Sequence, residues 1–399
     1  MGMKGVGEQS HGDTRLMNAH QERAERLRAY FAQDPSNSDL ACELADALSA
    51  AGEPVDARAV LESIVGDGAH APGVRFRRAR IALSTGAYAE AVDAFHAMIA
   101  DGIDAAAVRH DLAFAQLCLQ QSDDAMATLQ GAIDAYGPSP ELFVLKSRIA
   151  SMQGDFPLAV ASADAALQMR PDDAQALGVK ALAQLDGNEN EAAADTARAA
   201  LEVDPDQHEA LLVASTLCLW EQNLDPAEHF FERALARHPN SGRALSGYGQ
   251  LLMLRNDLPR AAGVLEHAVR TMPNHIGTWH ALAWNQLLRG ERDAAENSYR
   301  HAYDVDRNFG DTHGGLALCA ALRGDYDDAE QSVKRALRLD PNAMTARYAQ
   351  ALIMEARGDA DGSEARIAEL LPKDGVFASL PVREFAQRLK ATLQQNARR

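Results

Sequence analysis

The residues that most often carry chemistry are scattered along this sequence. Among its thirteen histidines, His275 and His280 are the only pair near a helical spacing, and at five residues apart they do not share one helix face. The HExxH, GxSxG and GxxxxGK patterns of metal, acyl-transfer and phosphate sites are absent, as is a GxGxxG loop. We therefore expect no enzymatic activity, no metal site and no cofactor.

The cysteines and the paired aspartates have simpler structural explanations. The four cysteines lie tens of residues apart with no CxxC pair, which indicates neither a zinc site nor a disulfide framework. We expect them to pack as small apolar groups within helices: Cys42, Cys118, Cys218 and Cys319. Asp123-Asp124 and Asp327-Asp328 stand where helices are expected to begin, and carboxylates there complement the helix dipole.

Composition limits the classes of partner. The chain has 399 residues, and 39 basic against 57 acidic side chains give a net charge of −18. Nucleic acids and anionic membranes attract an excess of lysine and arginine, so neither is an expected partner. No apolar run approaches the roughly 18 residues of a membrane span, and no signal peptide is evident. We therefore expect a cytoplasmic protein without membrane insertion, and the alanine and arginine content suggests a bacterial source.

The elements that would position any site follow a period of 34 residues. Pro171, Pro205, Pro239 and Pro273 mark this period, and ten blocks without insertion run from residue 38 to residue 377. The blocks begin at Ser38, Pro72, Ala106, Pro140, Ala174, His208, Gly242, Ile276, Gly310 and Met344. The eighth position is always small: Ala45, Ala79, Ala113, Ser147, Ala181, Ser215, Gly249, Ala283, Ala317 and Ala351. The twentieth position is alanine from Ala57 to Ala329 and serine at Ser363.

Each block is predicted to form two amphipathic helices joined by a tight turn. Apolar residues recur at helical spacing in its first and second fourteen residues. The fifteenth position is mostly glycine, with Asn188 and Asn256 as substitutes, and both residue types tolerate the left-handed backbone that ends a helix. The small positions are expected where two helices cross too closely for a side chain larger than a methyl group.

A 34-residue helix-turn-helix with this pattern resembles the tetratricopeptide repeat. The resemblance implies an all-α, right-handed α-solenoid of about ten repeats with helical caps. We expect a disordered segment at residues 1–16, a half-repeat helix at 17–37, repeats from 38 to 377 and a capping helix at 378–399. One departure is Gly314-Gly315, which is expected to weaken a helix by roughly 1 kcal/mol per glycine.

In that family the first helices of successive repeats line a concave surface that binds a partner segment. The inward positions would be the second, fifth, sixth, ninth, twelfth and thirteenth of each block. Projecting them onto this chain gives a candidate site of Phe76, Arg77, Arg80, Phe114, Arg148, Trp220, Trp284 and Tyr348. The hypothesis is an apolar or amphipathic protein segment, with an aromatic pocket near Trp220 and Trp284 and a basic patch of the three arginines. The alternative is that the aromatic residues pack against second helices and the arginines pair with nearby acids.

Two better-known binding modes of the family are not predicted here. The carboxylate clamp needs basic residues at the fifth position and asparagines at the sixth and ninth, and the sixth position contains no asparagine. The asparagine ladder of the protein-glycosylating relatives is absent for the same reason.

We expect a scaffold or adaptor protein. A more specific form of this expectation is a chaperone or assembly factor for a bacterial secretion, pilus or envelope complex. The alternative is a regulatory subunit that controls a soluble enzyme or transcription factor. The sequence leaves open whether the partner segment is extended or helical, and leaves the oligomeric state open.

Overall fold

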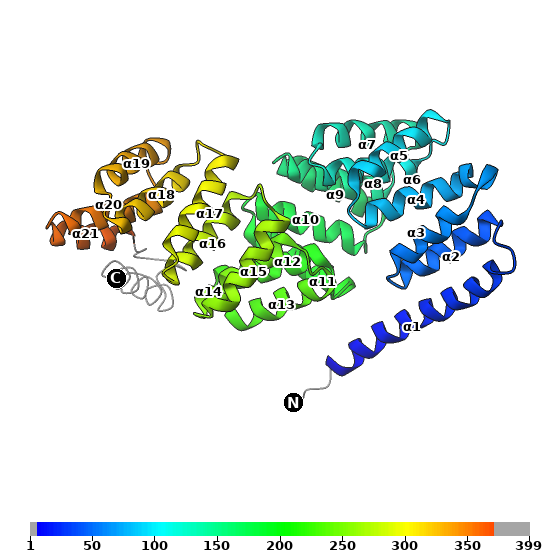
Figure 1. Ribbon diagram of the computed structural model, residues 1–399, viewed down its shortest axis with the longest axis horizontal. Coiled ribbons are helices and arrows are strands. Elements are labelled where there is room, and N and C mark those ends of the chain that lie inside the picture. Colours follow the sequence, from blue (N-terminus) through cyan, green and yellow to red (C-terminus); the bar gives the residue numbers. More distant parts are fainter. Residues whose placement is uncertain (1–5, 371–399) are drawn as a thin grey trace. The chain divides into compact units, whose positions relative to one another are not determined.

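The chain is helical throughout the part that the structure, a computed structural model, describes. That part comprises residues 6–370, which form twenty-one α-helices, one short 3-10 helix and no strand (Figure 1). The all-α fold predicted from the periodicity is therefore confirmed. The expected capping helix at 378–399 and the end of the tenth repeat lie outside the described residues.

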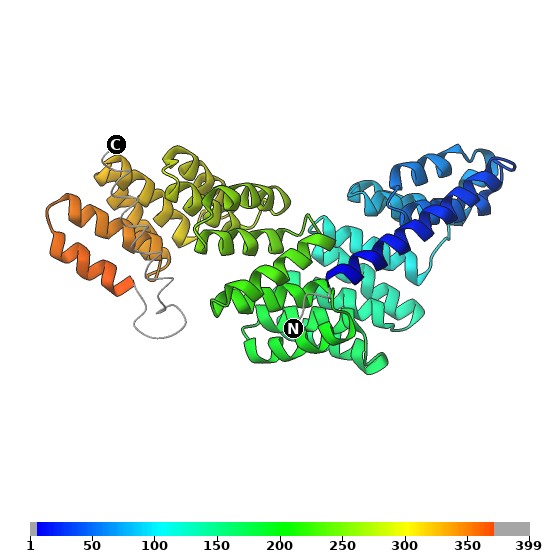
Figure 2. The same ribbon diagram turned by 90° about the horizontal axis from the view of Figure 1, so that it is seen from below.

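The helices fall into two compact units, which we call the N-terminal unit (up to Gly187) and the C-terminal unit (from Asn188). In each unit, successive helices lie beside one another in sequence order, as the graded colours of Figures 1 and 2 show. The N-terminal unit contains α1 (Val6–Phe31), α2 (Ser38–Ala50), α3 (Pro54–Ser63), the 3-10 helix η1 (Gly66–His70), α4 (Pro72–Ser84), α5 (Tyr88–Ala100), α6 (Ala106–Cys118), α7 (Ser122–Tyr136), α8 (Pro140–Met152), α9 (Phe156–Met169) and α10 (Ala174–Asp186).

The C-terminal unit continues the same alternation of first and second helices. It contains α11 (Asn190–Val203), α12 (His208–Trp220), α13 (Leu224–Arg237), α14 (Gly242–Leu254), α15 (Leu258–Thr271), α16 (Ile276–Leu288), α17 (Arg292–Val305), α18 (Gly310–Arg323), α19 (Tyr326–Leu339), α20 (Met344–Ala356) and α21 (Ala360–Leu370). The even-numbered helices from α2 to α20 are the first helices of the repeats and the odd-numbered helices that follow them are the second; α10 ends the N-terminal unit and α11 begins the C-terminal unit.

The first helix differs from expectation at its start. Helix α1 begins at Val6, inside the segment that we expected to be disordered. Its C-terminal half packs on the first hairpin, because Ala24 is buried and Leu27 and Phe31 lie against the core formed by α2, α3 and α4. The hydrophobic surface of the first hairpin is thus covered by a preceding helix, as a solenoid end requires.

The small residues that define the period are buried at helix crossings. The eighth-position residues from Ala45 to Ala351 and the twentieth-position residues from Ala57 to Ser363 are all buried. In most hairpins a larger buried residue of the second helix fills the space beside them, such as Phe95, Phe231 or Tyr299. These crossings therefore accommodate only glycine, alanine or serine, which is the physical basis of the repeat.

The turn inside every hairpin places its fifteenth residue in the left-handed region. Six of these residues are glycines, with φ between 77° and 91°, and Asn188 and Asn256 adopt φ of 63° and 61°. Gln120 and Gln222 hold the same position in two further repeats, and both adopt φ of 62°. The turn geometry is thus imposed by the two packed helices, even where the residue type does not favour it.

The glycine pair in the ninth repeat has a packing role that the sequence analysis missed. A Cβ atom on Gly315 would lie 2.2 Å from Cε1 of Tyr299, and one on Gly314 would lie 2.1 Å from Oγ1 of Thr345. Gly247 has the same relation to Phe231, with a clash distance of 2.4 Å. The glycines reduce helix propensity, but they also make room for a fully buried aromatic ring and for the close approach of α18 and α20.

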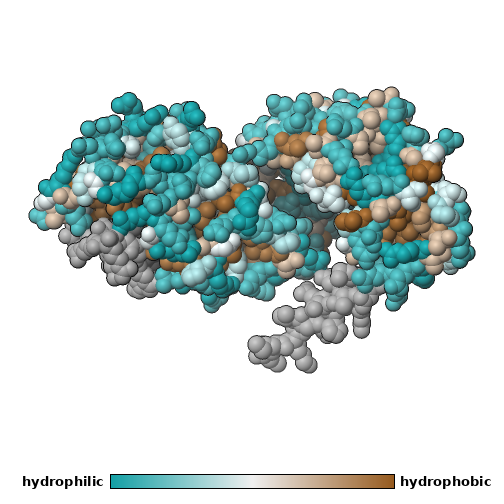
Figure 3. Space-filling view, viewed as in Figure 1, coloured by the Kyte–Doolittle hydropathy of each residue, from teal (hydrophilic) through white to brown (hydrophobic). Residues whose placement is uncertain are grey.

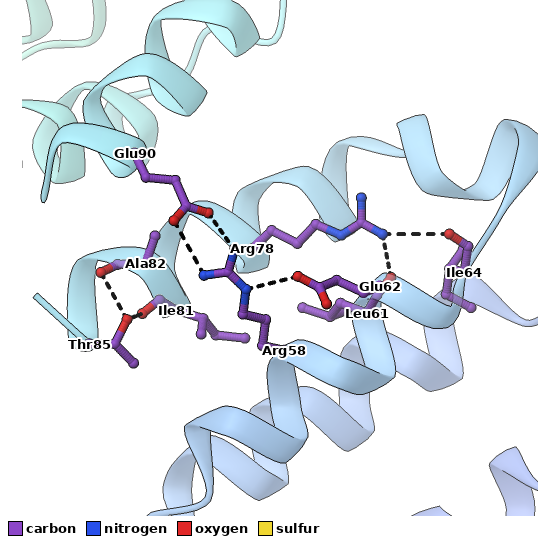
Figure 4. Close-up of polar contacts among 9 residues, drawn as sticks. All are labelled: Arg58, Leu61, Glu62, Ile64, Arg78, Ile81, Ala82, Thr85 and Glu90. Carbon is purple, nitrogen blue, oxygen red and sulfur yellow. Dashed lines mark hydrogen bonds and ion pairs between the residues drawn. The ribbon is translucent and has the colours of Figure 1, made fainter. Parts of the chain in front are cut away.

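Polar side chains of α3, α4 and α5 join the first two hairpins (Figure 4). Arg58 on α3 donates to Glu62, 2.8 Å away, and reaches Glu90 on α5 at 2.8 Å. Arg78 on α4 donates to the carbonyl oxygens of Leu61 and Ile64 at the end of α3. Arg78 therefore supplies hydrogen bonds to helix-end carbonyls, which have no partner inside the helix.

Candidate protein-binding surface

The first helices of the N-terminal unit are linked by ion pairs between inward positions. Arg77 on α4 donates from Nε to Oδ1 of Asp46 at 2.9 Å and from Nη2 to Oδ2 at 2.7 Å. Arg77 occupies the sixth position of its hairpin and Asp46 the ninth of the preceding one. This two-point contact engages two of the five N–H donors of the guanidinium. Arg77 also donates to the carbonyl of Gly73.

The next junction repeats this relation with the charges exchanged. Arg80, at the ninth position of its hairpin, lies 3.4 Å from Oδ2 of Asp111, at the sixth position on α6. The guanidinium of Arg80 also lies 5.7 Å from the ring centroid of Phe76, within cation–π range. His110 is adjacent, with Nδ1 2.9 Å from Oδ1 of Asp111. For Arg77 and Arg80 the structure thus favours pairing with nearby acids over an open basic patch.

The two predicted phenylalanines are half-buried. The ring of Phe76 lies 6.1 Å from that of Phe95 on α5, and Phe114 on α6 packs against the core that α6, α7 and α8 share. Arg148 on α8 is also half-buried. Met152, at the end of α8, is 51% exposed and offers more accessible apolar surface than either phenylalanine. Hydrophobic surface is visible around α4 in Figure 3.

Two inward carboxylates were not predicted as site residues. Asp39 and Glu43 lie on α2 at the second and sixth positions, and both are exposed. The signal that would have identified them is their position, because the same rule that selected Arg77 also selects Glu43.

In the C-terminal unit the three predicted aromatic residues differ in exposure. Trp220, the last residue of α12, is 43% exposed, whereas Trp284 on α16 is half-buried against the core. Within residues 6–370 no ring contact joins these two residues, so the expected aromatic pocket remains a prediction. Tyr348 on α20 is only 8% exposed and presents little surface to a partner. Burial raises the pKa of Tyr348 to about 12.

Three titratable groups of the C-terminal unit that have little access to water are held in their neutral forms. Burial lowers the pKa of His280 to about 4, and its Nε2 lies 2.8 Å from Oγ1 of Thr312. Burial raises the pKa of Cys319 to about 12 and raises the pKa of the enclosed Tyr299 hydroxyl as well. A neutral thiol and a neutral phenol are poor nucleophiles and bases, so these groups fit a packing role.

Between residues 6 and 370, no cluster of three or more histidine, cysteine, aspartate or glutamate side chains could hold a metal ion. Among the same residues, no helix has the length and apolar character needed to cross a membrane.

Comparison with known proteins identifies the repeat. A family model described as tetratricopeptide repeat matches residues 42–107, 144–208, 280–343 and 323–375, and a second model with that description matches residues 219–284. No curated protein sequence matches the chain.

Solved structures share the fold at low sequence identity. A monomeric mutant of IFIT1 with Gppp-AAAA is 14% identical, with a TM-score of 0.55 over 90% of this chain and 91% of that chain. The human IFIT1 dimer with m7Gppp-AAAA is 14% identical, with a TM-score of 0.52 over 84% and 90%. YrrB, titled a TPR protein with an unusual peptide-binding site, is 21% identical over 48% and 99%, with a TM-score of 0.38. The helix hairpins, their small crossing residues and the matched models lead to one conclusion: this chain belongs to the tetratricopeptide repeat family.

Proposed function

We propose that the chain is a protein-interaction scaffold or adaptor that binds a segment of another protein along its first helices. The observation that carries this proposal is the exposure of apolar side chains on those helices. Met152 and Trp220 are 51% and 43% exposed at the ends of α8 and α12, at the thirteenth position of their repeats. A large aromatic side chain at an accessible inward position is typical of a binding hot spot.

A peptide selection tests the scaffold function directly. Random peptides of about twelve residues, roughly 40 Å long when extended, would be displayed and selected on the immobilised full chain. We expect enrichment over the bare support, and expect Trp220→Ala to weaken at least one class of selected peptide by about tenfold. Leu339→Ala is the matched control, because Leu339 is 41% exposed at the end of a second helix. Absence of enrichment would contradict the scaffold proposal.

The finer proposal is a cytoplasmic chaperone or assembly factor for a bacterial secretion, pilus or envelope complex. It rests on analogy within the family. The alternative is a regulatory subunit of a soluble enzyme or transcription factor. Affinity purification from the native host followed by mass spectrometry separates the two, because components of a membrane apparatus would support assembly and a soluble enzyme or regulator would support control.

Nucleic acid is a poorer partner for this chain. The IFIT1 titles name m7Gppp-AAAA and Gppp-AAAA, but a likeness at 14% identity shows the fold alone. The net charge of −18 opposes the approach of a phosphate backbone. On the inner surface of the N-terminal unit, Arg77 and Arg80 already face carboxylates, which leaves them less available to phosphate.

A further inference from the structure

The inner surface of the N-terminal unit carries more negative than positive charge. The inward positions of α2, α4 and α6 hold four carboxylates, which are those of Asp39, Glu43, Asp46 and Asp111. They hold two guanidinium groups, those of Arg77 and Arg80, and His110 lies beside Asp111. Both arginines are engaged with carboxylates on the neighbouring first helix. Asp39 and Glu43 make no hydrogen bond or ion pair to any residue in the described part of the chain, and both are exposed.

This pairing determines whether an acidic or a basic partner can bind without first breaking ion pairs on the surface. An acidic segment would have to break the two-point contact of Arg77 with Asp46, or that of Arg80 with Asp111, before it gained a new one. A basic segment meets Asp39 and Glu43 directly and displaces only water. The overall charge of −18 adds a long-range attraction for cations, which favours encounter.

Apolar surface lies next to these carboxylates on the same unit. Phe76 and Leu83 on α4 and Phe114 on α6 are half-buried, and Met152 follows on α8 at 51% exposure. At the junction of α6 and α8, Phe114 and the buried Leu145 occupy the ninth and sixth positions that Asp46 and Arg77 occupy two junctions earlier. The residues that meet at these junctions therefore change from ion pairs between α2 and α6 to an apolar contact between α6 and α8.

We propose that this surface binds a cationic and partly apolar segment of a partner protein. Lysine or arginine side chains of the segment lie against Asp39 and Glu43 on α2, and its apolar side chains lie against Phe76, Leu83 and Phe114. The proposal rests on the scaffold function above and specifies the chemistry of the partner. The charge of this partner is opposite to the one that a basic patch would bind. The reason is that the carboxylates of Asp39 and Glu43 are available to a partner, whereas Arg77 and Arg80 are already paired.

The test compares two double variants that remove the same charge. Asp39→Asn with Glu43→Gln removes the open carboxylates of α2. Asp93→Asn with Asp124→Asn is the matched control: Asp93 lies within α5, and Asp124 lies in the first turn of α7 as Asp39 lies in that of α2. Both control residues are exposed on second helices. Peptides enriched on the wild-type full chain from the random library described above are synthesised, and their affinities for all three chains are measured by fluorescence anisotropy.

We expect the enriched peptides to combine lysine or arginine with apolar residues. A main class of them should lose about fivefold or more in affinity for the α2 variant and none for the control, and should weaken as salt is added. Enrichment of acidic or neutral peptides alone, or equal affinities for both variants, would overturn the charge proposal while leaving the scaffold function intact. Failure to enrich any peptide would overturn both.

Discussion

Arg77 on α4 binds both carboxylate oxygens of Asp46 on α2, and so joins the sixth position of one hairpin to the ninth position of the hairpin before it. The two residues are 31 apart in sequence, and the same separation joins Arg80 to Asp111 with the charges exchanged. One junction later the same two positions hold Phe114 and Leu145. A single geometric relation between first helices thus accepts either an ion pair or an apolar contact.

The first prediction concerns the strength of the Arg77–Asp46 contact. Because the two side chains are 30% and 51% exposed, water competes for both, and we expect a coupling of only about 0.2–1 kcal/mol in a double-mutant cycle. The cycle comprises Arg77→Ala, Asp46→Ala and the double variant, with the free energy of unfolding measured by urea titration. Added salt should reduce the coupling. A coupling above about 2 kcal/mol would show that the pair is a main determinant of helix spacing.

The second prediction concerns Gly315, where helix propensity and packing act in opposite directions. Gly315→Ala should gain about 1 kcal/mol of helix propensity, but the added Cβ lies 2.2 Å from the ring of the fully buried Tyr299. Overpacking of this kind costs about 1–3 kcal/mol or more, so we expect a net loss of stability.

The control for Gly315 is a glycine without a neighbour. A Cβ on Gly263, within α15, meets nothing within 4 Å, and Gly263→Ala should raise the free energy of unfolding by about 0.5–1 kcal/mol. Thermal unfolding followed by circular dichroism compares the two variants. If Gly315→Ala raised the melting temperature as Gly263→Ala should, Tyr299 could move aside and the close packing would not be obligatory.

These residues show which structural features could be predicted from the sequence. The hairpins were predictable because the small eighth and twentieth residues recur without insertion, and their burial follows from simple sterics. The ion pairs also had a signal, since oppositely charged inward residues stand 31 apart, but using it required knowledge of how neighbouring first helices are aligned. Gly247 and Gly315 likewise each stand 16 residues after the aromatic ring that they accommodate, Phe231 and Tyr299.

Other features depended on burial that no periodicity determines. Tyr348 and Trp220 both occupy predicted inward positions, yet one is 8% and the other 43% exposed, because exposure depends on how closely the neighbouring helices approach. The sequence also does not indicate where the chain divides into two units, since the period of 34 residues continues across Gly187 and Asn188 without an insertion.

The third prediction concerns acid stability. Burial lowers the pKa of His280 from 6.5 to about 4, so the folded C-terminal unit holds this ring neutral while the unfolded chain protonates it below pH 6.5. Asp311 opposes this shift only in part, and the ring is in contact with Thr312, Tyr299 and Phe309. The unfolded state then binds more protons, and stability falls as the pH drops from about 6.5 towards 4. The loss should reach about 2 kcal/mol at pH 5. Burial also lowers the pKa of His275, which acts in the same direction.

A variant separates this contribution from the protonation of carboxylates. His280→Gln should reduce the difference in unfolding free energy between pH 8 and pH 5 by about 2 kcal/mol, whatever its effect at pH 8. His267→Gln is the control, because His267 lies on the second helix α15 with its Nε2 2.9 Å from Oδ1 of Asn240 in an exposed contact. Identical pH profiles for the wild type and His280→Gln would show that His280 is accessible to protons in the folded chain.

The fourth prediction tests the alignment of the repeats themselves. Ala227, at the twentieth position of the sixth repeat, is fully buried in α13, where the first and second helices of the hairpin cross. Ala227→Leu should force these helices apart and reduce the free energy of unfolding by about 1–3 kcal/mol. Ala236 lies on the same helix but is exposed, so Ala236→Leu should change stability by less than about 0.5 kcal/mol. Since both substitutions add the same side chain to one helix, a difference between their melting temperatures reports the crossing alone. Equal melting temperatures would mean that the small twentieth residue does not limit how closely the helices approach.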